Sequence, residues 1–232
     1  MDTIILIETS TELCSAALAR NGEIVSYLES TEPCAHASLT AVFVKRLLDE
    51  AGLEAPDCSA VCVSMGPGSY TGLRVGVSTA KGLCFGAGIP LIATGTLDTL
   101  AWQAVSGSLL PDGCKYIIPM IDARRMEVYT APFSPDCRQL EDTAPLIIGA
   151  DSFSSYLDEG PVLFIGDGAA KASGIIHHRN ANFIQCCPKA SSMLVPAMKA
   201  YKEKRFEDVA YFEPFYLKEF VATVSKKNPL KK

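Results

Sequence analysis

The chain has 232 residues, of which 48% are hydrophobic and 20% are charged, and this balance is typical of a globular protein with one large domain or two modest ones. Its formal net charge of −5 argues against a dedicated nucleic-acid binder, which would carry an excess of basic residues, but it allows action on RNA through a partner. No signal peptide and no apolar run of membrane-spanning length is predicted, so we expect a cytoplasmic protein that does not enter a membrane. The nine cysteines form no Cys-x-x-Cys pair, and we expect buried, reduced thiols.

The first half of the sequence predicts three strands followed by alternating helices and strands. Asn21-Gly22 predicts a hairpin between the second and third strands, and Gly52 predicts the end of the first helix. Three antiparallel strands followed by crossover units indicate a mixed sheet with helices on its faces. The strands are expected at 3–7, 13–19, 23–29, 60–64 and 91–93, and the helices at 34–51, 71–86 and 97–105.

The second half begins in the same way and indicates a duplicated fold. Strands are expected at 116–121, 127–131, 145–148 and 162–165, and helices near 153–157, after Gly168 and within 188–204. The stretch 106–115 contains Gly107, Pro111 and Gly113 and is typical of a linker. We therefore divide the chain into lobes at 1–106 and 107–232, and the helix within 188–204 could pack on either lobe.

The segment 61–86 combines a β-branched strand, the loop Gly66-Pro67-Gly68-Ser69 and a helix. Such junctions often bind anions, because free backbone N–H groups converge at the start of the helix. The spacing matches neither the P-loop nor the dinucleotide-binding motif, so the loop by itself identifies no ligand.

The helix that follows this loop carries four glycines, at positions 72, 76, 82 and 86, within an arc of about 120°. Together they disfavour the helix by about 3–4 kcal/mol relative to alanine, so we expect a close neighbour on that face. The neighbour is either the chain's own sheet or helix, or a helix of a partner. The first helix is also more apolar than one covered face requires, because Leu39 and Val42 lie outside its main apolar stripe.

Polar residues end the first strand of each half. Glu8-Thr9-Ser10 could face a phosphate or a metal, or simply form a polar strand end. Asp122 occupies the equivalent place in the second half, but Arg124 stands where a phosphate site would favour a small residue, so we expect Arg124 to bind a carboxylate or a partner's groove. His36 is expected to begin a helix or to lie in an interface rather than to catalyse. No His-x-x-x-His pair and no Gly-x-Ser-x-Gly motif occurs.

Four segments of the sequence resemble the TsaB (YeaZ) family, whose members are partner proteins in making threonylcarbamoyladenosine (t6A) on tRNA. The segments are 4–18 around Glu8-Thr9-Ser10, 66–83 with the Gly-Pro-Gly-Ser loop, 122–129 with Asp122-Ala123-Arg124-Arg125, and 213–218. The family often has aspartate at the first position of the Glu-Thr-Ser element, so Glu8 is a departure.

The resemblance implies an α/β fold of two ASKHA-like lobes (the actin, Hsp70 and sugar-kinase type), each a mixed β-sheet flanked by helices, with the second lobe reduced. The catalytic relative TsaD has a His-x-x-x-His metal pair where this chain has Thr96 and Leu100. The resemblance therefore implies a non-catalytic subunit that heterodimerises with TsaD, joins TsaE in an ATP-dependent ternary complex, and forms homodimers when TsaD is absent. The complex transfers the threonylcarbamoyl group to the adenosine next to the anticodon of tRNAs reading ANN codons, and the chain would meet tRNA only through the complex.

The resemblance also implies a partner surface and a nucleotide or anion site, and it leaves one alternative function open. No catalytic or metal-binding residue and no tightly bound cofactor is expected in the chain alone. The alternative is a stand-alone ASKHA phosphotransferase or glycoprotease-like peptidase, which would need a metal site or a nucleophile. The implied partner or dimer surface comprises His36, Leu39, Val42, Phe43, Arg46, Thr71, Leu73, Val75, Gly76, Thr79, Ala80 and Leu83. The implied nucleotide or anion site, for ATP or ADP at the complex interface, comprises Glu8, Thr9, Ser10, Gly66, Pro67, Gly68, Ser69, Asp122 and Arg124.

Overall fold

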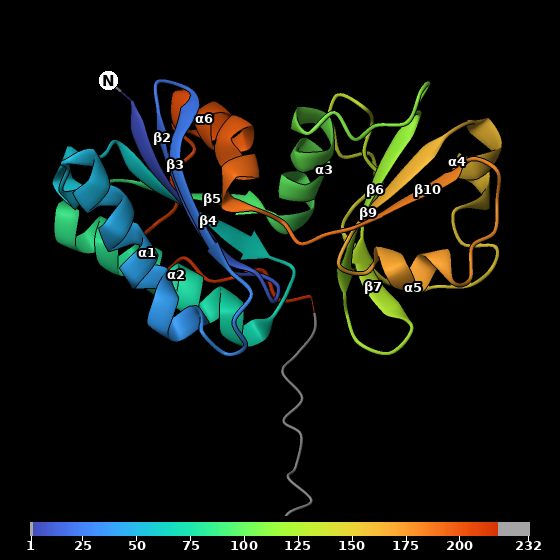
Figure 1. Cartoon of the computed structure of the whole chain (residues 1–232), viewed down its shortest axis with the longest axis horizontal. Helices are drawn as coiled ribbons and strands as arrows, with labels where there is room; N and C mark the ends of the chain where they lie inside the picture. The colour runs from blue at the N-terminus through green and yellow to red at the C-terminus, as the bar shows by residue number, and fades with distance from the viewer. Residues whose placement is uncertain (1, 218–232) are drawn as a thin grey trace, which may run out of the picture.

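The computed structural model describes residues 2–217, which form two lobes that lie side by side, each built on a five-stranded mixed sheet (Figure 1). In the first lobe the strand order is β3-β2-β1-β4-β5, with β1, β2 and β3 antiparallel and β4 and β5 parallel to β1. Its elements are β1 (Thr3–Glu8), β2 (Cys14–Arg20), β3 (Glu23–Ser30), α1 (His36–Ala51), η1 (Ala55–Asp57), β4 (Ala60–Gly66), α2 (Tyr70–Ala87), β5 (Leu91–Gly95) and α3 (Thr96–Ser106).

The second lobe repeats this plan with shorter elements and the strand order β10-β9-β6-β7-β8. Here β6, β7 and β8 are antiparallel, while β9 and β10 are parallel to β6. Its elements are β6 (Tyr116–Asp122), β7 (Glu127–Thr130), β8 (Ala144–Ile147), α4 (Ser154–Glu159), β9 (Val162–Gly166), α5 (Ala169–Ser173) and β10 (Ala181–Gln185). They are followed by η2 (Ala190–Met193) and α6 (Leu194–Lys202).

The alternation of side chains along β1 shows how the first lobe buries its sheet on both faces. Ile5 and Ile7 face α1 and α2, which lie together on one side, whereas Ile4 and Leu6 face η2 and α6 on the other (Figure 1). The helix within 188–204, which the sequence left unassigned, therefore packs on the first lobe although it follows the second.

Helix α3 lies between the two lobes (Figure 1). Its buried Leu97, Leu100 and Ala104 pack with Ile117 and Leu163 of the second sheet, although α3 follows directly from the last strand of the first. The two lobes thus exchange helices, with α3 closing the second sheet and α6 the first.

The predicted fold class, two ASKHA-like α/β lobes with mixed sheets, is confirmed by this topology. Asn21-Gly22 forms the predicted hairpin turn, with both residues at positive φ, and Gly52 ends α1 at φ 64°. The sequence analysis missed β10, because this strand carries Asn182 and Gln185 and its residues are only half-buried or exposed.

The cysteines and the helices bear on two further expectations. None of the nine cysteines forms a disulfide within residues 2–217, but only four are buried, and Cys34 is exposed rather than buried as predicted. Burial raises the pKa of Cys62 to about 12, which keeps that thiol protonated.

Among the described residues, no helix is long and apolar enough to cross a membrane. The lysines at 218, 226, 227, 231 and 232 lie outside the described residues.

Candidate functional site

A cleft of about 1060 Å³ lies between the lobes, where the carboxyl ends of β1 and β6 and the start of α2 meet. It brings together six of the nine residues predicted for the nucleotide or anion site: Ser10, Pro67, Gly68, Ser69, Asp122 and Arg124. The other three lie close by without lining it. Glu8 and Thr9 are fully buried behind the floor, and Gly66 lines a smaller neighbouring cavity.

The floor of the cleft is formed by the end of β1. The Ser10 N–H donates to Glu8 Oε1 at 2.7 Å, and the Ser10 carbonyl accepts from the Ser69 N–H at 2.6 Å. Burial raises the pKa of Glu8 to about 7, and hydrogen bonding with Ser10 offsets part of this rise. Ser10 Oγ and Thr11 Oγ1 are buried and meet no hydrogen-bond partner at standard geometry within residues 2–217, although the Ser10 side chain interacts with Glu8 and the Thr11 side chain with the Cys187 thiol. The floor therefore carries two hydroxyls whose hydrogen bonds within this part of the chain are weak.

The start of α2 is held against this floor through glycine. Ser69 caps the helix by accepting from the Gly72 N–H, and Thr9 Oγ1 donates to the Gly72 carbonyl at 2.8 Å. A Cβ at either Gly72 or Gly76 would overlap Thr9. Close packing inside the chain thus explains these two glycines, and it fixes the first turn of α2 beside the cleft.

The second-lobe wall of the cleft is the turn between β6 and β7. Arg124 and Arg125 both adopt left-handed backbone conformations, at φ 70° and 48°, which side chains other than glycine and asparagine disfavour. Asp122 Oδ1 holds the turn by accepting from the Arg124 N–H and from Lys171 Nζ, each at 2.6 Å. The turn therefore presents two arginines to the cleft at a cost in backbone strain, which is a common mark of a functional site.

An acidic group lies beside the two arginines. Asp167, which the sequence analysis did not select, accepts from the Asp122 N–H at 2.8 Å. Its pKa is raised to about 6 by burial and by the nearby carboxylates of Asp122 and Glu12. Within residues 2–217, no group of three or more His, Cys, Asp and Glu side chains could hold a metal ion.

Two tyrosines and an arginine form the first-lobe rim. The rings of Tyr70 and Tyr216 lie 4.9 Å apart, and the Arg74 guanidinium lies 4.2 Å from the centre of the Tyr70 ring. Arg74 Nε also donates to the Tyr216 hydroxyl at 3.3 Å. The sequence analysis missed this rim, because the segment with Tyr216 reaches it only by running back along α2, where Lys81 Nζ donates to the Ala210 carbonyl at 3.1 Å.

The residues predicted for the partner surface do not all reach the surface of α1 and α2. Leu73, Gly76 and Ala80 are buried in the first lobe, and this corrects their assignment: they pack against the chain's own sheet and against Thr9. Phe43 and Leu83 are partly buried against the same core. At least partly exposed on the helices are His36, Leu39, Val42, Arg46, Thr71, Val75 and Thr79.

The outer face of α2 has exposed features that the predicted set omitted. Phe85 is 86% exposed, and Val42 on α1, which the predicted set included, is 54% exposed. A Cβ at Gly82 or Gly86 would meet no atom of residues 2–217 within 4 Å, so packing within that part of the chain does not explain these two glycines.

His36, Thr96 and Leu100 each make contacts within the fold. His36 is the first residue of α1, and its Nε2 lies 2.9 Å from the Thr11 carbonyl oxygen. Thr96 is fully buried with its hydroxyl 2.9 Å from that of Ser64, and Leu100 is buried in the core around α3.

Comparisons with known proteins agree with this architecture. The family model "TsaD: tRNA N6-adenosine threonylcarbamoyltransferase" matches residues 33–226. The "tRNA threonylcarbamoyladenosine biosynthesis protein TsaB" of Escherichia coli K12 is 30% identical over 230 residues, which cover 94% of this chain and 96% of that protein. The protein of the same name from Bacillus subtilis 168 is 32% identical over 227 residues, covering 93% and 94%. The solved structure "YeaZ from Pseudomonas aeruginosa" has a TM-score of 0.81 at 27% identity, and the match covers 94% of this chain and all of that one. The chain therefore belongs to the TsaB (YeaZ) family of tRNA threonylcarbamoyladenosine biosynthesis proteins.

Proposed function

We propose that this chain is a non-catalytic subunit of the machinery that makes t6A, and that it docks onto a TsaD paralogue through the outer face of α1 and α2. TsaE joins the pair, and tRNA is met only through the complex. Without TsaD, the same face forms a homodimer. The observation that carries the proposal is the pair Gly82 and Gly86, which lie inside a helix with open space before them.

These two glycines disfavour helix formation and make no close contact in return within residues 2–217. A glycine inside a helix is about 1 kcal/mol less favourable than alanine, and alanine would fit at both positions. Glycine allows another helix backbone to approach closely, and Phe85 beside it offers a large apolar side chain for burial. A helix of a partner therefore accounts for both features.

The non-catalytic part of the proposal is supported by the interior around α3. At the two positions where TsaD has metal-binding histidines, the chain has a threonine bonded to Ser64 and a leucine in the core. Neither side chain can replace an imidazole ligand.

The cleft fits a phosphate-bearing ligand, and we assign it the ATP or ADP of the assembled complex. Ser10 and Thr11 place weakly bonded hydroxyls at its floor, α2 begins at its edge, and Arg124 and Arg125 face it from the other lobe. A nucleotide phosphate would find hydrogen-bond donors on both sides. Calorimetry with Mg·ATP tests this assignment: binding should appear when the TsaD and TsaE paralogues are added, and no heat change under that condition contradicts it.

Reconstitution tests the main proposal. Purified TsaD, TsaE and TsaC proteins are mixed with ATP, threonine, bicarbonate and tRNA, with and without this chain. We expect t6A only when the chain is present and no t6A from the chain alone. Equal modification without the chain would refute the scaffold role.

A pair of substitutions tests the docking face. Phe85→Asp places a charge at the centre of the proposed contact, and we expect at least about a tenfold loss of affinity for TsaD. Val25→Asp is the matched control, because Val25 is 50% exposed and lies on β3, outside both helices. Equal affinities of the two variants would contradict the assigned face.

A further inference from the structure

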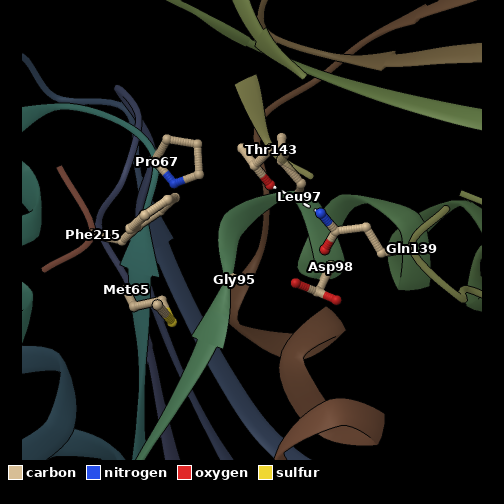
Figure 2. A pocket seen from close by; sticks show the side chains of 9 residues that line it. Met65, Pro67, Gly95, Leu97, Asp98, Gln139, Thr143 and Phe215 are labelled. Carbon is tan, nitrogen blue, oxygen red and sulfur yellow. Dashed lines mark hydrogen bonds between the residues drawn. The ribbon is translucent and has the colours of Figure 1, made fainter. Parts of the chain in front are cut away.

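A second cavity, of about 210 Å³, lies between the lobes and has no role in the function proposed above (Figure 2). Pro67 and Phe215 line both this cavity and the main cleft, so these two side chains form the wall between them. The other residues lining it are Met65, Gly66, Gly95, Leu97, Asp98, Gln139 and Thr143.

Asp98 is the one charged residue that lines this cavity. It lies in the first turn of α3, and a Cβ at Gly95 would overlap Asp98 Oδ2, so glycine at that position makes room for the carboxylate. Figure 2 shows the carboxylate at the cavity. Burial raises the pKa of Asp98, with only partial relief from Arg205, whose Nε pairs with Glu203 at 2.7 Å.

Gln139 supplies a second acceptor from the other lobe. Its Nε2 donates to the Glu141 carbonyl at 2.8 Å and to Thr143 Oγ1 at 3.2 Å, so both amide hydrogens are used within its own loop. In the described part of the chain the amide oxygen has no hydrogen-bond partner, and it points toward the side of the cavity where Asp98 lies (Figure 2). The Asp98 carboxylate and the Gln139 amide oxygen thus line one cavity as two acceptors, the first on a half-buried residue and the second on an exposed one.

The rest of the cavity decides which donor fits. Met65, Leu97 and Phe215 make much of the wall apolar, which suits a methylene chain. A hard metal ion would require more oxygen ligands than one carboxylate and one amide supply. An ammonium or guanidinium group has several donors and no acceptor, which suits the two acceptors supplied by Asp98 and Gln139.

We propose that this cavity binds one basic side chain, lysine or arginine, of a polypeptide segment. Its charged group lies between the Asp98 carboxylate and the Gln139 amide oxygen, and its aliphatic part packs on Met65, Leu97 and Phe215. Because the two acceptors come from different lobes, the bound side chain bridges the lobes.

Nuclear magnetic resonance of the full chain tests the proposal with N-acetyl-lysine amide as the probe and N-acetyl-norleucine amide as its uncharged match. The lysine probe should shift the Gln139 side-chain amide signal to saturation, and it should lower the pKa of Asp98 followed by its carboxyl carbon. The norleucine probe should do neither. Equal effects of the two probes, or no saturable shift with the lysine probe, would overturn the proposal.

Two variants complete the test. Asp98→Asn should weaken the lysine probe at least about tenfold, because a hydrogen bond to a charged group is lost. Asp112→Asn, at an exposed aspartate outside the cavity, should leave the affinity unchanged. Retained affinity in Asp98→Asn would refute the assignment. The pKa measurement in the unaltered chain holds even if that variant does not fold.

One further arm identifies the source of the side chain. A full-length variant has glutamine in place of all five lysines beyond residue 217. If the chain's own lysines compete for the cavity, the probe should bind this variant more tightly than the unaltered chain. Equal saturable binding to both assigns the site to a basic side chain of another protein.

Discussion

Glu8 shows how one buried residue couples stability to pH. It is fully buried and its Oε2 has no hydrogen-bond partner in the described part of the chain. Its pKa rises from 4.5 to about 7, so the folded chain holds a proton that the unfolded chain releases. The stability linked to this proton is fully present below pH 4.5 and is lost as the pH rises through about 7.

Glu8→Gln should therefore flatten the pH dependence of stability. The difference between the two pKa values corresponds to about 3 kcal/mol, which the unaltered chain loses between pH 4.5 and 8 at this residue. Glutamine keeps the oxygen that accepts from the Ser10 N–H and cannot ionise. Urea unfolding at several pH values measures the effect, with Glu23→Gln at an exposed glutamate as the control. Parallel profiles for all three proteins would contradict this account.

We expect the left-handed backbone of Arg124 and Arg125 to lower the free energy of unfolding, while their side chains supply positive charge to the cleft. Replacing the pair by Asn-Gly, the residues that favour consecutive left-handed conformations, should raise the free energy of unfolding by about 1 kcal/mol. The same change should lower t6A formation in the reconstituted system, because both positive charges are lost. Replacing both by lysine keeps the charges and the strain, and should leave the stability unchanged. A double variant that is neither more stable nor less active would refute the trade-off.

Sequence reasoning located part of the cleft because it could recognise where strands end. Ser10, Ser69 and Asp122 each follow a buried strand or begin a helix, and such positions meet at one edge of a parallel sheet. Tyr216 gave no comparable signal, whereas Asp167 directly follows the buried strand β9 and could have been selected by the same reasoning. Tyr216 reaches the cleft through contacts with α2 from the far end of the chain, and Asp167 depends on a bond across the second sheet.

Among the elements, α2 has two kinds of glycine, and the sequence could not separate them. All four lie on one arc of the helix, but Gly72 and Gly76 touch Thr9 while Gly82 and Gly86 face open space. The arc straddles the boundary between the buried and exposed sides of the helix. Only the position of β1 in the fold decides which glycines are covered.

Two alanine substitutions in α2 should have opposite effects on stability. Gly76→Ala places a Cβ against Thr9 and should lower the free energy of unfolding by about 1–3 kcal/mol. Gly82→Ala meets no atom and should raise it by about 1 kcal/mol, while weakening the complex with TsaD. Urea unfolding and a TsaD binding assay measure the two quantities separately. If Gly82→Ala left TsaD affinity unchanged, a close helix contact at that residue would be refuted.

At the scale of the whole molecule, the exchange of α3 and α6 makes the two lobes depend on each other. Gln103 on α3 strengthens this dependence at the point where the chain returns to the first lobe. Its Nε2 donates to the Cys187 carbonyl at 3.1 Å, and its Oε1 accepts from the Lys189 N–H at 3.0 Å. The segment that leads from β10 to η2 is therefore hydrogen-bonded to α3, a helix that packs in the core of the second lobe.

We expect the two lobes to unfold in one transition for this reason. Trp102, the single tryptophan, lies on α3 and reports on the shared helix, while circular dichroism reports on both sheets. The two signals should change at the same urea concentration. Gln103→Met fills the same space but makes neither hydrogen bond, so it should lower the free energy of unfolding by about 1–3 kcal/mol and shift both signals together. Gln103→Ala, which also removes packing, should shift them further. Two separate transitions in the unaltered chain would mean that the lobes fold independently, and the exchanged helices would then not couple them.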